Sequence, residues 1–119
     1  MAKTQEIIDT LIKGLQDKKG RNICTVDLSR FDTAPARAFV ICTGGSPQQV
    51  DALADSAENF CRERLGERPA AVVGKANCMW VAMDFGDVIL HIFLPTERDY
   101  YDLEHLWDDA EVKHIEDVD

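Results

Sequence analysis

The sequence predicts an α/β fold, a single domain with a mixed five-stranded β-sheet flanked by helices. Helical and extended hydrophobic patterns alternate in the order α, β, β, α, β, β, β, α. The last two extended runs flank Phe85-Gly86, which is the spacing of an antiparallel hairpin. An earlier helix is long enough to cross over between parallel strands, so the sheet should contain both strand directions.

The first helix is indicated by a single apolar stripe near the N-terminus, formed by Ile7, Ile8, Leu11, Ile12 and Leu15. Lys18 and Lys19 supply a cationic last turn, and Gly20 follows as a helix-ending glycine. Extended runs come next at residues 23–28 and 38–43, separated by a polar loop. The second run is nearly all apolar, as expected for a strand covered on both faces.

The sharpest local signal is Gly44-Gly45-Ser46-Pro47, which predicts a turn and then a helix. Ser46 can cap the first turn, and Pro47 suits the first helical position, where an N–H has no partner inside the helix. Gly66 is placed to close this helix. The short apolar run at residues 70–73 is then expected to form a buried strand.

Residues 78–84 and 87–94 form the predicted hairpin. A two-residue turn would pair Asp84 with Asp87 and Trp80 with His91, whereas a longer loop around Gly86 would shift these pairs. One face is uniformly apolar and is the expected core face, with Met79, Val81, Met83, Val88, Leu90 and Ile92. The other face mixes Trp80, His91 and Phe93 with the two carboxylates, a mixture that suits contact with a partner.

Pro95 ends the last strand of the hairpin, and Thr96 with Asp99 resembles a capping box. A final short helix is expected at residues 97–107. The domain should then span residues 1–110, and residues 111–119 should form an acidic, mobile tail because they contain little apolar material.

The chain has 119 residues and a formal net charge of -9, which disfavours binding to nucleic-acid phosphates. The charge would attract a basic partner, but taken alone it is better explained as a means of staying soluble. Cys24, Cys42, Cys61 and Cys78 lack the spacing of a metal site and are expected to be small buried hydrophobes. No secretory signal and no window of transmembrane length is visible. These features predict a cytoplasmic protein with reduced thiols and no membrane contact.

No set of residues assembles catalytic chemistry, so we expect no enzyme activity, cofactor or metal. A nucleotidyltransferase would need a pair of closely spaced carboxylates on a strand. No Asp-x-Asp or Asp-x-Glu triplet lies on a predicted strand of this sequence. The alternative is a nucleotide-binding enzyme that uses the Gly44-Gly45-Ser46 turn as an anion cradle. His91 is interpreted as a satisfied, half-buried histidine rather than a general base.

Aromatic side chains give the strongest signal for a binding surface. Trp80 is interpreted as an interface residue because its hairpin face also carries charge, whereas core and interface remain equally open for Tyr101. A third possibility is a homodimer in which this aromatic face pairs with itself.

The C-terminal half resembles the Iojap family of ribosomal silencing factors. The resemblance lies in an ordered pattern, which consists of Trp80, Asp84-x-Gly86-Asp87-Val88, His91 and Arg98-x-x-Tyr101-x-Leu103-Glu104-x-Leu106-Trp107. Weaker similarity covers most of the chain. The sequence departs from the family pattern at Arg37, at Pro47-Gln48-Gln49 and at Val73.

The resemblance implies a nucleotidyltransferase-like fold without the catalytic metal pair. It also implies binding to the fourteenth protein of the large ribosomal subunit, steric obstruction of small-subunit joining and lower translation when nutrients are scarce. Organellar relatives act in ribosome assembly, which is a further alternative. The side chains expected to bind the partner are Trp80, Asp84, Asp87, His91, Arg98, Tyr101 and Glu104.

Overall fold

The computed structural model describes residues 3–118. Its helices are α1 (Thr4–Asp17), α2 (Pro47–Leu65) and α3 (Pro95–Tyr101), followed by the short 3-10 helix η1 (Leu103–His105). Its strands are β1 (Arg21–Asp27), β2 (Ala38–Thr43), β3 (Ala71–Val73), β4 (Trp80–Asp84), β5 (Val88–Phe93) and β6 (Glu111–His114).

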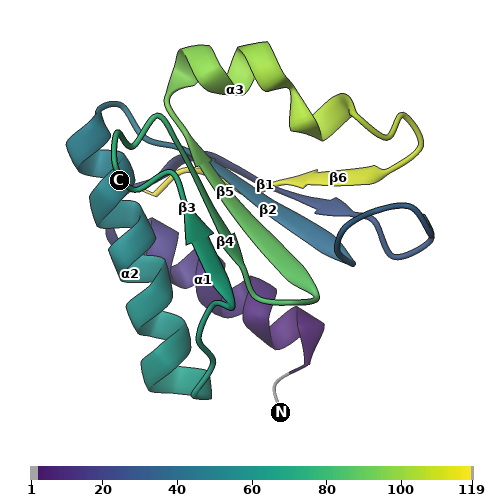
Figure 1. Cartoon of the computed structure of the whole chain (residues 1–119), viewed down its shortest axis with the longest axis horizontal. Coiled ribbons are helices and arrows are strands. Elements are labelled where there is room, and N and C mark those ends of the chain that lie inside the picture. Colours follow the sequence, from purple (N-terminus) through teal and green to yellow (C-terminus); the bar gives the residue numbers. More distant parts are fainter. Residues whose placement is uncertain (1–2, 119) are drawn as a thin grey trace.

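The strands form one mixed sheet in the order β3-β4-β5-β2-β1-β6. β2 and β5 run parallel, and the other neighbouring strands run antiparallel. In Figure 1, α1 and α2 lie against one face of this sheet, while α3 and the segment that follows it pass over the opposite face. The α/β class and the mixed sheet are therefore confirmed.

The sheet has six strands rather than five. The additional strand is Glu111–His114, which pairs antiparallel with β1. These residues belong to the segment 111–119, for which the sequence predicts a mobile tail. Backbone pairing and the packing of Val112 and Ile115 against core residues account for this strand. The last residue of the expected tail, residue 119, lies outside the described residues.

Helix α2 begins and ends where the sequence predicts. The Ser46 hydroxyl accepts the Gln49 N–H at 3.1 Å, Pro47 is the first helical residue, and Gly66 closes the helix at a φ of 67°. Helix α1 ends differently, because Lys19 rather than Gly20 takes the left-handed conformation, with a φ of 58°. Gly20 instead allows the chain to pass close to Cys42, since a Cβ at this position would lie 2.5 Å from Cys42 Sγ.

Two apolar clusters fill the two faces of the sheet. The larger one packs α1 and α2 onto the sheet, and Leu11, Leu15, Val40, Leu53 and Leu90 are all fully buried in it. The smaller one lies beneath α3 and η1 and contains Val26, Leu28, Phe39, Ile41 and Phe93, with Leu103 and Trp107 packed against it. All four cysteines are buried and free, as expected.

The hairpin confirms the two predicted faces but not the two-residue turn. Asp84 pairs with Ile89, and Trp80 pairs with Phe93, which is a shift of two residues from the simplest register. The Phe85 N–H donates to the Val88 carbonyl at 2.8 Å, so the loop is longer than Phe85-Gly86 alone. Asp84 and Asp87 are therefore not cross-strand neighbours. Because the shift is even, the side chains within the two strands keep their predicted faces. Met79 is the exception, since it precedes β4 and is 42% exposed instead of lying in the core.

Three further expectations for the C-terminal half are wrong. Strand β3 lies at an edge of the sheet and is exposed rather than buried. No side chain caps α3, so the Thr96–Asp99 capping box is absent. The expected helix over residues 97–107 ends at Tyr101, because Asp102 adopts a left-handed conformation with a φ of 48° before η1 begins.

Candidate functional site

Four side chains form an aromatic platform, defined here as Trp80, His91, Phe93 and Tyr101. The centre of the Trp80 ring lies 5.0 Å from Phe93 and 4.5 Å from Tyr101. The platform forms because adjacent strands β4 and β5 bring Trp80 opposite Phe93, while α3 ends with Tyr101 above them. Phe93 is buried, Trp80 is half-buried and Tyr101 is 45% exposed, so the stack rises from the core to the surface.

His91 lies on β5 inside the platform and is buried. The indole N–H of Trp80 donates to its Nδ1 atom at 3.0 Å. Desolvation lowers the pKa of His91 to about 4, so the imidazole is neutral at pH 7. The sequence interpretation of a half-buried, satisfied histidine is only partly correct, since the side chain is buried and its Nε2 atom has no hydrogen-bond partner among the described residues.

A buried ion pair holds the segment that carries Tyr101. Arg98 Nε and Nη2 donate to the two carboxylate oxygens of Glu104 at 3.2 and 3.0 Å, which is a bidentate pair. Both side chains are largely buried, with 10% and 15% of their surface exposed. The two residues are six positions apart and meet because the chain turns at Asp102.

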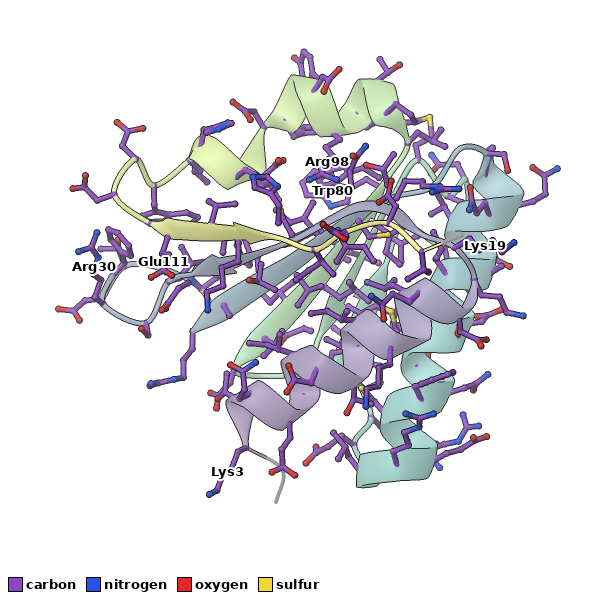
Figure 2. The ribbon with its side chains drawn as sticks, turned by 180° about the vertical axis from the view of Figure 1, so that it is seen from behind. Lys3, Lys19, Arg30, Trp80, Arg98 and Glu111 are labelled. Atoms are coloured by element: carbon purple, nitrogen blue, oxygen red, sulfur yellow. The ribbon has the colours of Figure 1, made fainter. Side chains whose placement is uncertain are left out.

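The same guanidinium joins this segment to the sheet. Arg98 Nη1 donates to the Thr43 hydroxyl at 2.9 Å and to the Asn22 carbonyl, and Nη2 lies 3.5 Å from Cys24 Sγ. Burial alone would lower the pKa of Arg98, but the hydrogen bonds and charge of Glu104 outweigh it and raise the pKa above its usual value. In Figure 2, the labelled side chains of Arg98 and Trp80 both lie between α3 and the sheet.

The predicted partner-binding residues therefore fall into two groups. Trp80, Tyr101 and the two aspartates reach the surface, whereas His91, Arg98 and Glu104 are held inside by contacts of this chain. Both aspartates already accept hydrogen bonds from this chain. Asp84 accepts the Gly86 N–H at 2.8 Å, and Asp87 accepts the Thr4 hydroxyl at 3.0 Å.

Exposed apolar side chains lie on the chain segments next to the platform residues. Tyr100 is 81% exposed and Leu106 is 61% exposed on the segment after β5. Val73 and Met79 are exposed on the approach to β4. Residues 95–111 contain seven acidic residues and Arg98 as their only Lys or Arg. The exposed rings are thus set in a strongly acidic surface.

Gly74 is a site residue that sequence reasoning missed. It has a φ of 91°, and a Cβ atom there would lie 1.9 Å from the Trp80 carbonyl oxygen. Only glycine allows the chain to pass so close to Trp80. The nearby Lys75 ammonium bridges Asp51 and Asp55 of α2 at 2.6 and 2.7 Å, which fastens this loop to the helix. A glycine just before the hairpin was the available signal.

The Gly44-Gly45-Ser46 turn is closed by its own chain. The Gly45 N–H donates to the Gln49 side-chain oxygen at 2.7 Å, and the Gln49 amide group lies 3.4 and 3.3 Å from the Lys18 and Lys19 carbonyls. Gln49 therefore occupies the position that an anion would need. Within residues 3–118, no group of three or more His, Cys, Asp and Glu side chains is arranged to hold a metal ion.

The fold and the surface together define a small α/β domain with an exposed aromatic surface set in acidic residues. A sequence model of the family "Ribosomal silencing factor during starvation" matches residues 1–119. The chain belongs to this family. None of the helices in the described part of the chain is long and apolar enough to span a membrane.

Individual relatives agree with the family assignment. The chain is 40% identical over 103 residues to a ribosomal silencing factor of Chromobacterium violaceum, covering 87% of this chain and 83% of that protein. A crystal structure of a C. violaceum protein has a TM-score of 0.85 and 36% identity, with 97% and 94% of the two chains covered. A mouse protein named for mitochondrial assembly of the large ribosomal subunit is 29% identical over 102 residues, covering 84% of this chain and 44% of that protein.

Proposed function

We propose that this protein represses translation by binding the large ribosomal subunit through its fourteenth protein and sterically blocking the small subunit. It acts in the cytoplasm during nutrient limitation, and it acts by binding alone. The observation that carries this proposal is the exposed Tyr101 ring, stacked on Trp80 and set in the acidic segment 95–111. A large apolar surface with an acidic surround suits a basic protein surface.

The contacts are divided between the ends of the hairpin. Trp80 and Tyr101 are apolar anchors at one end, and Asp84 and Asp87 receive basic side chains at the other. The internal partners His91, Arg98 and Glu104 hold the anchors in place. This division follows from burial, because a carboxylate already paired inside the chain gains little from a second cation.

The test is co-sedimentation of the purified protein with isolated large and small ribosomal subunits, followed by addition of the missing subunit. Selective binding to the large subunit and fewer joined ribosomes are expected. No binding even at low salt would overturn the proposal, because screening would then be at its weakest.

Substitution of the anchors locates the surface. Tyr101→Ala should weaken capture about 30-fold, since truncating a central anchor costs about 2 kcal/mol. Trp80→Ala should weaken capture while leaving the domain folded, and unfolding would instead assign Trp80 to the core. Phe60→Ala is the matched aromatic control, because Phe60 lies on α2 beneath Arg64. Its capture should equal that of the unsubstituted protein.

A second candidate role is assembly of the large subunit, and it is favoured by similarity to the mouse protein named for mitochondrial assembly of that subunit. If assembly is the role, cells that lack this protein should accumulate incomplete large subunits even in rich medium. If the protein only silences ribosomes, they should not. Homodimer formation through the ring surface would compete with ribosome binding. Sedimentation across a concentration series, with Tyr101→Ala as comparison, measures that competition.

A further inference from the structure

The Trp80–His91 hydrogen bond assigns a tautomer to the histidine. An indole N–H can only donate, so His91 Nδ1 must be the acceptor in the 3.0 Å contact. A neutral imidazole carries one proton, which then lies on Nε2. The low pKa of His91 agrees with this neutral form.

This tautomer leaves a buried donor without an oxygen or nitrogen acceptor. No atom of residues 3–118 accepts a hydrogen bond from His91 Nε2, and the side chain is only 6% exposed. Its ring meets the Phe39 ring at 4.6 Å and 76°, an edge-to-face contact. A nonpolar residue would fill this position without an unpaired N–H. The presence of a histidine at this position is therefore best explained by its Nδ1 atom, which accepts the Trp80 indole N–H.

Its other nitrogen fixes the indole of Trp80. The hydrogen bond turns the only polar atom of that side chain toward the interior. The indole then stacks on Phe93 with an interplanar angle of 27° and meets Tyr101 at 42°. A free indole N–H would favour rotation toward water or toward an acceptor on a partner.

We propose that His91 is a positioning residue that holds the indole N–H of Trp80 inside the domain, so that Trp80 offers its partner a ring surface and no hydrogen-bond donor. The partner group that fits such a surface is apolar or a flat cation such as a guanidinium. The inference about the partner rests on the function proposed above. The hydrogen bond itself can be tested without a ribosome.

The first measurement uses the unsubstituted, ¹⁵N-labelled full chain. We expect the ¹⁵N shifts of His91 at pH 7 to show a protonated Nε2 and an unprotonated Nδ1. The indole N–H of Trp80 should exchange with solvent at least tenfold more slowly than an indole without a hydrogen bond. A proton on Nδ1, or rapid exchange of this N–H, would overturn the proposal.

Two similarly shaped substitutions separate the acceptor from the packing. His91→Asn keeps an oxygen near the position of Nδ1, whereas His91→Leu has no acceptor. His91→Leu should speed the exchange of the Trp80 indole N–H at least tenfold and weaken large-subunit binding at least tenfold. His91→Asn should keep most of the slow exchange of the Trp80 indole N–H and most of the large-subunit binding. Equal binding by the two folded variants would refute the positioning role.

A double-mutant cycle tests whether the N–H also reaches the partner. Trp80→Phe removes the N–H, and His91→Leu removes its acceptor. If the N–H acts only through His91, the double variant should bind the large subunit as well as whichever single variant binds it less tightly. If the fold-loss of binding in the double variant equals the product of the two single fold-losses, the N–H contacts the partner and the proposal is overturned. If the unsubstituted protein does not bind the large subunit, the proposed function fails, while the exchange data still decide the hydrogen bond.

Discussion

Glu104→Gln should destabilise the domain strongly, although the two side chains have nearly the same size and shape. The substitution removes the negative charge opposite Arg98, whose guanidinium is largely buried and keeps its own charge. Removing one partner of a buried ion pair typically costs about 3 to 5 kcal/mol. The glutamine keeps one acceptor for the 3.2 and 3.0 Å contacts, so we expect a loss of about 2 to 3 kcal/mol.

Urea denaturation followed by tryptophan fluorescence measures this loss, because Trp80 and Trp107 both pack on the face that the ion pair closes. The matched control is Asp55→Asn, which removes one carboxylate from an exposed pair with Lys75 at 2.7 Å. That pair has 37% and 60% exposed side chains, so its loss should cost at most about 0.5 kcal/mol.

A double variant tests whether the unpaired charge of Arg98, rather than altered packing, causes the loss of stability. Arg98→Met combined with Glu104→Leu removes both charges and should recover part of the stability lost by Glu104→Gln. A cost for Glu104→Gln no larger than that of Asp55→Asn would refute the reasoning, because burial would then make no difference to the pair.

Two further predictions concern the same face. The pKa of His91 is near 4 in the folded chain and about 6.5 when unfolded, so its contribution is complete above pH 6.5 and is lost as the pH falls toward 4. At pH 4.5 the unfolding free energy should drop by about 2 to 3 kcal/mol more in the unsubstituted protein than in His91→Leu, and equal drops would contradict this. Gly74→Ala should cost about 2 kcal/mol or more in urea denaturation because its Cβ meets the Trp80 carbonyl, whereas Gly86→Ala, with a φ of 88° and open space around its Cβ, should cost about 1 kcal/mol. Equal costs would show that the chain can move away from Trp80.

Local chemistry explains which elements the sequence could predict. The boundaries of α2 depend on Ser46, Pro47 and Gly66, and each of these acts on its own neighbours. The two faces of the hairpin follow from alternation and survive a register shift. Strand β6 depends instead on pairing with β1, more than eighty residues earlier in the chain. Its own composition, EVKH, carries no comparable signal.

The candidate site was predicted in part for the same reason. Trp80 and Tyr101 stood out by residue type, and the structure brings their rings to 4.5 Å. The sequence could not show that Arg98 and Glu104 pair with each other, because their spacing of six positions matches no helical neighbour. They meet only because Asp102 turns left-handed, an event that no pattern around it predicts.

The internal ion pair also bears on how the acidic surface is maintained. Seven acids within residues 95–111 repel one another, and Arg98 is the only Lys or Arg among them. The packing of the partly buried Leu103 and Trp107 against the core and the anchoring of Arg98 to the sheet oppose that repulsion. A basic partner would relieve it further, so binding and the folding of this segment should favour each other. The residues that never touch the partner would then contribute to affinity by keeping the exposed rings and acids in one arrangement.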